Sequence, residues 1–262
     1  MPFLDSHKAK IYYEVHGEGP GFLLIAGLSS DSNSWQYIKK PLSKEFTLII
    51  YDNRGCGRTE SEGPFNLADL ASDAISLIDH LGHNKVHLLG HSMGGMIAQE
   101  IAITQSERID KLILASSSTR LSDKGQQKLD DLYNKWLNGI DMAEWYRLMF
   151  KDLFSSKVTS NKQFMDAAII FALSYPYAQS LDGFKRQLDT IKNFDFSHRI
   201  RNILHETLII SGSEDILIPV EESRQLLNIG GKTHFQIIDE AAHSLHAEKP
   251  GEFSEIVMKF CG

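Results

Sequence analysis

The segment 86–98 constrains the fold of this chain more than any other stretch of its sequence. It starts with an apolar run typical of a buried strand, and this run ends abruptly at Gly90. After Gly94 and Gly95 the apolar residues recur at helical spacing. The segment therefore predicts a strand, a sharp turn and a helix. Ser92 is expected to project from the turn, because its glycine neighbours leave room for a crowded backbone.

A serine in such a turn has a position suited to a nucleophile. The turn directs the backbone N–H of Met93 and the start of the following helix at one small volume, where negative charge would be stabilised. A serine hydroxyl is a weak nucleophile by itself and needs a base that is oriented by an acid. The rest of the chain must therefore bring a histidine and a carboxylate to Ser92.

Short apolar runs alternate with segments of helical periodicity along most of the chain. Continuous apolar runs of this length are typical of strands buried on both faces of a parallel sheet. The runs cover 22–26, 46–51, 86–89, 112–115, 207–210 and 234–238, and the helical segments include 35–42, 67–81, 93–105, 220–227 and 250–260. With an early hairpin strand at 10–16, this pattern predicts an α/β fold with a mostly parallel, doubly wound sheet of about eight strands.

Two loops after predicted strands carry the residues that Ser92 needs. Ligands bind at the carboxyl ends of parallel strands, so residues just after each run are candidates for chemistry. Asp215 follows the run 207–210, and His243 follows the run 234–238. The chain order Ser92, Asp215, His243 is one known arrangement of nucleophile, acid and base.

Residues close to this trio offer alternatives for two of the roles. Glu214 could serve as the acid instead of Asp215, and His246 or His91 could serve as the base. The position of each residue in its loop favours Asp215 and His243. A residue directly beside the turn serine is usually packed under or beside the site, which makes His91 the weaker candidate.

The alternation of strands and helices stops between residues 119 and 193. This segment contains several amphipathic helices and many aromatic residues, and it predicts a helical lid inserted into a core made of residues 1–118 and 194–262. Aromatic helices above a serine site would make an apolar pocket with few fixed polar groups. Trp145, Met149 and Phe150 are the lid residues expected to contact a substrate.

From about residue 9 onward, the sequence resembles the α/β-hydrolase superfamily and, within it, the lid-bearing serine esterases. The motifs that carry the resemblance are Ala26-Gly27-Leu28-Ser29-Ser30 with Trp35, the segment 51–59, Gly90-His91-Ser92-Met93-Gly94-Gly95, the segment 211–215, and Ala242-His243-Ser244 leading to Glu248-Lys249-Pro250. Similar proteins include carboxylesterases, pimeloyl carrier-protein methyl ester esterases, enol-lactone hydrolases and cofactor-free perhydrolases. The match of several motifs in register identifies the superfamily but not the substrate.

The resemblance implies a role for each residue of the site. Ser92 would attack a carbonyl carbon, His243 would take and return the proton, and Asp215 would orient the imidazole. Met93 would supply one backbone donor to the oxyanion, and the family implies that Leu28 supplies the other. Many relatives carry His-Gly where this chain has Ala26-Gly27, so the conformation of that loop is open.

Composition and charge favour a small-molecule enzyme over other classes of protein. The formal net charge of −7, without a cluster of Lys or Arg, argues against a nucleic-acid partner. No apolar run is long enough for a membrane span, and the first residues do not resemble a secretory signal, so a cytoplasmic location is expected. Cys56 and Cys261 are expected to be free thiols. No metal and no cofactor are expected, because the sequence shows neither close-spaced metal ligands nor a phosphate-binding glycine loop.

Taken together, these features predict an enzyme that hydrolyses carboxylic esters with small to medium apolar acyl groups through an acyl-serine intermediate. An enol-lactone hydrolase or a cofactor-free perhydrolase would use the same residues and is the main alternative. A receptor that binds a ligand on this scaffold without turnover is a further alternative. The substrate would be a small molecule, and the chain would act as a monomer or homodimer.

Overall fold

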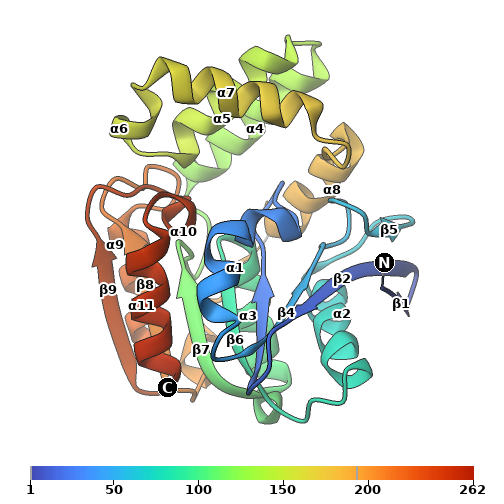
Figure 1. Cartoon of the computed structure of the whole chain (residues 1–262), viewed down its shortest axis with the longest axis vertical. Helices are drawn as coiled ribbons and strands as arrows, with labels where there is room; N and C mark the ends of the chain where they lie inside the picture. The colour runs from blue at the N-terminus through green and yellow to red at the C-terminus, as the bar shows by residue number, and fades with distance from the viewer. Residues whose placement is uncertain (1, 193) are drawn as a thin grey trace.

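A nine-stranded sheet forms the centre of the computed structural model, which describes residues 2–192 and 194–262 (Figure 1). The spatial order is β1-β2-β4-β3-β6-β7-β8-β9, and the short strand β5 pairs with β2. The strands are β1 (Phe3–Ser6), β2 (Ala9–His16), β3 (Gly21–Ile25), β4 (Thr47–Tyr51), β5 (Glu60–Ser61), β6 (Val86–His91), β7 (Ile109–Ala115), β8 (Thr207–Gly212) and β9 (Thr233–Ile238). All neighbours from β4 to β9 are parallel, and β1, β2 and β5 pair antiparallel. The predicted α/β class and mostly parallel sheet are confirmed.

The strand order reverses between β3 and β6. The chain passes from β3 to β4 in one direction along the sheet, and β6 then pairs with β3 on its other side. Loops that leave the carboxyl ends of β3 and β6 therefore diverge, and such a switch point is where open α/β sheets bind ligands. The loop with Leu28 and the turn with Ser92 lie on the two sides of this point.

Helices cover both faces of the sheet because the strands are apolar on both faces. Leu23 and Ile25 of β3 pack into a core with helices α2 (Leu67–His80) and α3 (Met93–Thr104). The alternating residues Phe22 and Leu24 pack on the opposite face with α1 (Gln36–Leu42) and α11 (Pro250–Cys261). This alternation within one strand is the period-2 geometry of a β-strand, and it produces the layers seen in Figure 1.

In the described part of the chain, five α-helices lie between β7 and β8. They are α4 (Asp123–Leu137), α5 (Met142–Leu153), α6 (Ser156–Thr159), α7 (Lys162–Ser174) and α8 (Leu181–Lys192). Helices α4 to α7 form a separate layer at one end of the sheet, and α8 lies beside the core (Figure 1). The two ends of this inserted helical segment meet, because Arg120 and Asp195 form an antiparallel bridge and Phe196 N–H donates to the Thr119 carbonyl at 2.8 Å. Residue 193, the last residue of the predicted insertion, lies outside the described residues.

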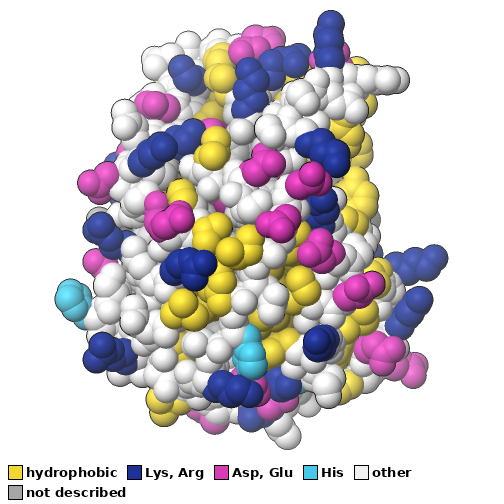
Figure 2. Space-filling model, turned by 90° about the vertical axis from the view of Figure 1, so that its left-hand side faces the viewer, with side chains coloured by type: hydrophobic (Ala, Val, Ile, Leu, Met, Phe, Trp, Pro, Cys, Tyr) yellow, Lys and Arg dark blue, Asp and Glu magenta, His cyan; other side chains and the backbone are white. Residues whose placement is uncertain are grey.

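Further features of the chain concern its helices, its surface and its cysteines. None of the helices in the described part of the chain has the length and apolarity needed to cross a membrane. On the face that carries β9 and α6, acidic and basic side chains are interspersed with hydrophobic ones (Figure 2). Cys56 and Cys261 are buried free thiols.

A buried ion pair anchors the loop after β4 to helix α2. Arg54 donates from Nε to Asp73 Oδ2 at 2.6 Å and from Nη2 to Asp73 Oδ1 at 2.7 Å. Its Nη2 also donates to the His7 carbonyl at 2.6 Å. The hydrogen bonds to Asp73 raise the pKa of Arg54 further above its usual value. The two side chains are only 3% and 2% exposed, so water does not compete for these charge-assisted hydrogen bonds.

Replacing Asp73 by Ala is expected to destabilise the protein by about 3–5 kcal/mol, because the change leaves the Arg54 guanidinium buried without its counter-charge. Urea denaturation of the variant measures this loss. Asp79→Ala is the matched control, since Asp79 pairs with Arg108 but is 58% exposed, and exposed pairs contribute at most about 1 kcal/mol. Equal losses for the two variants would contradict the anchoring role of Arg54 and Asp73.

Candidate active site

Ser92 is the single residue between β6 and α3. Its backbone has φ 54° and ψ −120°, a strained conformation for a residue with a side chain. The turn is so tight that a Cβ atom at Gly94 would lie 2.0 Å from the Ile25 carbonyl oxygen, so only glycine fits there. The Ser92 side chain makes no capping hydrogen bond to α3. The predicted strand, sharp turn and helix are therefore present, and the serine hydroxyl is not occupied by the helix it precedes.

Asp215 and His243 form a buried hydrogen-bonded pair at the ends of β8 and β9. Asp215 Oδ2 lies 2.8 Å from His243 Nδ1, and the two side chains are 0% and 3% exposed. The other carboxylate oxygen accepts from Leu217 N–H at 3.0 Å and Ile218 N–H at 2.8 Å. The carboxylate is thus fixed on one side by backbone donors and fixes the imidazole on the other. This arrangement holds a histidine with Nδ1 protonated and Nε2 as the free base.

The loop that carries His243 touches the residue before Ser92. His91 Nε2 lies 2.9 Å from the His243 carbonyl oxygen, and the two imidazole centroids are 5.0 Å apart. Because a carbonyl can only accept, His91 Nε2 must carry the proton. Burial, assisted by the neighbouring His246, lowers the pKa of His91 well below its usual value, so the ring is neutral. His91 therefore connects the serine turn to the His243 loop.

The alternative acid Glu214 and the alternative base His246 have other contacts. Glu214 Oε2 accepts from Ser156 N–H at 2.9 Å and from Ser156 Oγ at 2.8 Å, at the start of α6. The His246 ring packs against Trp35 at 4.8 Å between centroids, and its buried Nδ1 has no hydrogen-bond partner among the described residues. The structure thus brings Asp215, rather than Glu214, to His243.

The two backbone donors expected at the oxyanion lie on either side of the switch point. Met93 is the first residue of α3, and the N–H at that position has no acceptor within the helix. In the described part of the chain, the Leu28 N–H makes no backbone hydrogen bond. A Cβ atom at the adjacent Gly27 would lie 3.1 Å from Ser92 Cβ, so this loop passes directly beside the serine. Both N–H groups are therefore available near Ser92.

Comparison with known proteins places this architecture in a family. A family model described as the alpha/beta hydrolase fold matches residues 20–250. The chain belongs to the α/β-hydrolase fold family. It is thus a hydrolase by family, and the resemblance drawn from its motifs is confirmed.

Individual relatives of this hydrolase differ in what their names say they act on. A protein of Azorhizobium caulinodans named "Putative carbamate hydrolase RutD" is 26% identical, over 100% of this chain and 98% of its own length. The enol-lactonase from Burkholderia xenovorans LB400 superposes with a TM-score of 0.88 at 22% identity, covering 99% of both chains. A thermophilic esterase from Thermogutta terrifontis superposes with a TM-score of 0.83 at 23% identity, over 97% of this chain and 93% of its own. At 22% and 23% identity, the enol-lactonase and esterase structures show only that this chain has the same fold.

The inserted helices of this hydrolase have an aromatic interior. Trp145 is 1% exposed and donates from Nε1 to the Leu132 carbonyl at 2.9 Å. Its ring packs on Trp136 and Phe184, at centroid distances of 4.6 and 5.8 Å. The structure therefore places Trp145 inside the inserted segment. Met149 is only partly buried and packs against the hydrophobic cluster to which Trp145 belongs.

Phe150 follows on the same helix, and its surroundings are also aromatic. Its ring lies 5.8 Å from those of both Tyr146 and Phe154, measured between centroids. Phe150 is partly buried, so it is less enclosed than Trp145. Of the three predicted substrate contacts, Met149 and Phe150 are thus the ones that the packing leaves partly accessible.

The inserted segment also touches the His243 loop through contacts that the sequence did not predict. Glu248 accepts from Ala242 N–H at 2.8 Å and from Ser155 N–H at 3.0 Å, with a different carboxylate oxygen for each. Ser244 N–H donates to the Leu153 carbonyl at 2.9 Å. The residues on both sides of His243 are therefore tied to the segment between α5 and α6. Glu248 lies in a motif noted in the sequence, but nothing there indicated its two partners.

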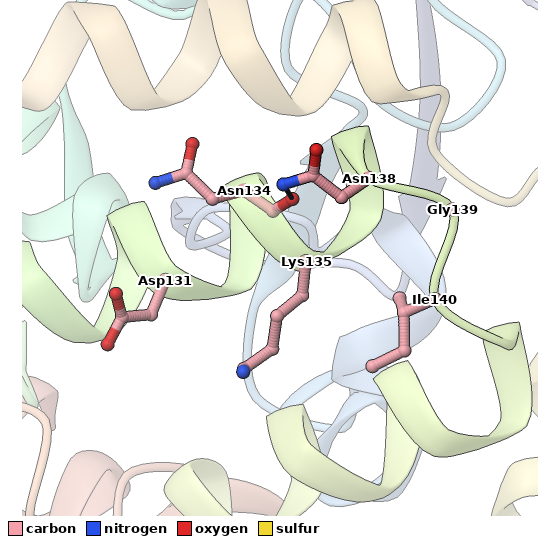
Figure 3. A pocket seen from close by; sticks show the side chains of 6 residues that line it. All are labelled: Asp131, Asn134, Lys135, Asn138, Gly139 and Ile140. Atoms are coloured by element: carbon pink, nitrogen blue, oxygen red, sulfur yellow. Dashed lines mark hydrogen bonds between the residues drawn. The ribbon is translucent and has the colours of Figure 1, made fainter.

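Two surface hollows lie away from these residues. One of about 450 Å³ is lined by residues of α4 and the following loop, namely Asp131, Asn134, Lys135, Asn138, Gly139 and Ile140 (Figure 3). A second of about 420 Å³ is lined by Ser61, Gly63, Pro64, Asp182 and Arg186. Neither lining includes Ser92, Asp215 or His243, so these hollows are not candidates for the reaction site. Within the described residues, no group of three or more His, Cys, Asp or Glu side chains could hold a metal ion.

Replacing His246 by Phe is expected to reduce the loss of stability in acid. Burial, together with the nearby His243, lowers the pKa of His246 from 6.5 to about 3. Between these values the unfolded chain binds the proton and the folded chain does not, so stability falls as the pH falls through this window. Removing the group should recover roughly 2 kcal/mol of the stability lost between pH 7 and pH 5.

Urea denaturation at the two pH values measures this difference for the wild type and for His246→Phe. Phenylalanine keeps the aromatic contacts with Trp35, and no hydrogen bond of Nδ1 is lost. His198→Gln, at an exposed position, is the control and should leave the pH dependence unchanged. An unaltered difference between pH 7 and pH 5 in the Phe variant would contradict a buried neutral His246.

Proposed function

We propose that this hydrolase cleaves carboxylic esters with small to medium apolar acyl groups, through an acyl-serine intermediate formed on Ser92. The observation that carries the proposal is the buried Asp215–His243 pair, with 2.8 Å between Oδ2 and Nδ1. This pair is joined through His91 to the turn that presents Ser92. A base held in one tautomer, linked through His91 to a strained and uncapped serine, supports this proposal because acyl transfer to a hydroxyl needs an oriented base.

The proposed reaction has two halves. Ser92 Oγ attacks the ester carbonyl carbon while His243 Nε2 takes its proton, and the imidazolium is stabilised by Asp215. The carbonyl oxygen becomes an oxyanion that accepts from the N–H groups of Leu28 and Met93. Collapse of this intermediate expels the alcohol, which takes the proton from His243. Water then repeats the sequence on the acyl-serine, releasing the acid and restoring Ser92.

The inserted segment 119–193 acts as a lid in this proposal, above a core made of 1–118 and 194–262. Its apolar residues Met149 and Phe150 would contact the acyl group. Trp145 would support them from inside the segment, where its ring is enclosed by Trp136 and Phe184. An apolar cover with few fixed polar groups favours an acyl chain over a sugar or a charged peptide.

Carbamate hydrolysis is a second candidate function. It is favoured by the relative named for this activity, which this chain matches over nearly its whole length. A carbamate carbonyl would undergo the same attack by Ser92, with the same oxyanion donors. Enol-lactone hydrolysis and perhydrolysis also use this set of residues, so a substrate panel has to separate the candidates.

Replacing Ser92 by Ala should abolish turnover of p-nitrophenyl esters, because the proposed acyl intermediate forms on the Ser92 hydroxyl. Release of p-nitrophenol is followed for acetate to decanoate esters, and the optimal chain length measures the acyl pocket. An aryl carbamate and an enol-lactone complete the panel. Wild-type turnover that persists in Ser92→Ala would remove Ser92 from the mechanism, and wild-type binding without turnover would favour a receptor.

Replacing Asp215 by Asn should lower kcat by about 10⁴-fold with the fold intact, because the amide would hold His243 in the wrong tautomer. Steady-state kinetics with the best ester of the panel measures the change. Glu214→Gln is the matched control at the adjacent position, since Glu214 contacts Ser156 and not His243. Near-normal activity of the Asn variant, with a large loss for Glu214→Gln, would reverse the assignment of the acid.

A further inference from the structure

The loop that carries Leu28 is a tight turn with an unusual conformation. Ser30 N–H donates to the Gly27 carbonyl at 3.2 Å, so Leu28 and Ser29 are the two central residues of the turn. Ser29 has φ 61°, and Leu28 is not among the residues with positive φ. This combination is that of a type II turn, in which the second central position favours glycine. A serine there is strained, so a contact from outside the turn must help to hold it.

Gln187 of α8 makes that contact. Its Oε1 accepts from Ser29 N–H at 3.0 Å, which is the N–H of the central peptide of the turn. The rotation of this central peptide is what distinguishes type I from type II turns. The acceptor on Gln187 thus selects the observed rotation and opposes relaxation of Ser29 to negative φ.

The Gln187 amide also bonds to the loop that carries Arg54 and to Gln179. Nε2 donates to the Arg54 carbonyl at 2.9 Å, and the Arg54 side chain is fixed by the buried pair with Asp73. Gln179 Nε2 donates to Gln187 Oε1 at 2.9 Å, which completes the bonding of that oxygen. Gln187 is fully buried, so water does not compete for these bonds.

Close packing of α8 on the core brings Gln187 to this position. A Cβ atom at Gly183 would lie 2.2 Å from the Gly55 carbonyl oxygen, so glycine is needed where the helix crosses the loop. Gln187 lies one helical turn after Gly183 and therefore on the same face of α8. In Figure 1, α8 lies next to the core, below α7.

We propose that Gln187 is a positioning residue for the oxyanion donor Leu28, acting through the peptide that joins Leu28 to Ser29. The inference rests on the proposed function, since it requires Leu28 N–H to stabilise an oxyanion formed at Ser92. The inserted helical segment thereby contributes to rate as well as to substrate binding. A glutamine in an amphipathic helix gives no sign of this role in the sequence.

The experiment compares kinetics and inhibition in a small set of variants. Gln187→Leu removes the acceptor, and kcat/KM for the best ester should fall about 10- to 100-fold, less than the full loss of an oxyanion donor. A trifluoromethyl ketone adds to Ser92 Oγ and places a negative oxygen at the same donors, while the serine proton passes to His243. Its Ki should rise by a similar factor, with KM for the ester changed less than threefold.

A double variant separates positioning from general damage to the protein. Ser29→Gly relieves the positive-φ strain, so Gln187→Leu combined with Ser29→Gly should recover a large part of both kcat/KM and inhibitor affinity. Thr190→Val is the matched control. Thr190 Oγ1 donates from the same helix to the Phe65 carbonyl at 3.2 Å, and its loss should leave kcat and Ki near wild type.

The outcomes are distinguishable from failure of the proposed function. If wild-type turnover survives Ser92→Ala, the proposed function fails before any Gln187 variant is made. If Ser92 is required and Gln187→Leu keeps wild-type kcat/KM and Ki, the positioning role is wrong. The positioning role is also wrong if adding Ser29→Gly to Gln187→Leu restores neither kcat/KM nor inhibitor affinity. Should Gln187→Leu fail to fold, Gln187→Glu retains an acceptor for Ser29 N–H. A Ki raised by about 100-fold or more in that variant, the size expected for full loss of an oxyanion donor, would overturn the inference.

Discussion

Parallel pairing of β6 with β3 on one side and β7 on the other is the constraint on which the rest of this structure depends. It places the carboxyl ends of β3, β6, β8 and β9 at one edge of the sheet. The loops with Leu28, Ser92, Asp215 and His243 leave from those ends. The tight approach of Gly94 to the Ile25 carbonyl then fixes the serine turn against β3, so the loop after β3 must pass beside Ser92.

The inserted helices contact both halves of the candidate site. On one side the segment between α5 and α6 bonds to the residues that flank His243, through Leu153 and Glu248. On the other side α8 bonds to the turn after β3, through Gln187. In the proposed mechanism, these contacts make the inserted segment part of the structure that holds the reacting groups. Movement of this segment would therefore disturb the His243 loop and the turn after β3 together.

Burial decides the protonation of the groups around the serine. His91 and His246 are both enclosed, and burial lowers the pKa of each, so both rings are neutral near neutral pH. The carboxylate of Asp215 remains compatible with burial because two backbone N–H groups and an imidazole surround it. The same logic holds for Arg54, whose guanidinium is buried only because Asp73 faces it. The buried charged groups Asp215 and Arg54 therefore each have identified partners.

The sequence by itself determined the sheet, the serine turn and the order of the candidate residues, because local apolar periodicity and glycine spacing act within a few residues of each other. The strands β1 and β5, of four and two residues, were not predicted, because such short strands show little periodicity. Only the tertiary structure decided that Asp215 rather than Glu214 meets His243, and that Trp145 is enclosed within the inserted segment. It alone also revealed Gln187 and Glu248 as links between segments far apart in the chain. Neighbouring residues of like chemistry differ only in the direction in which the fold points their side chains, and that direction is set by long-range packing.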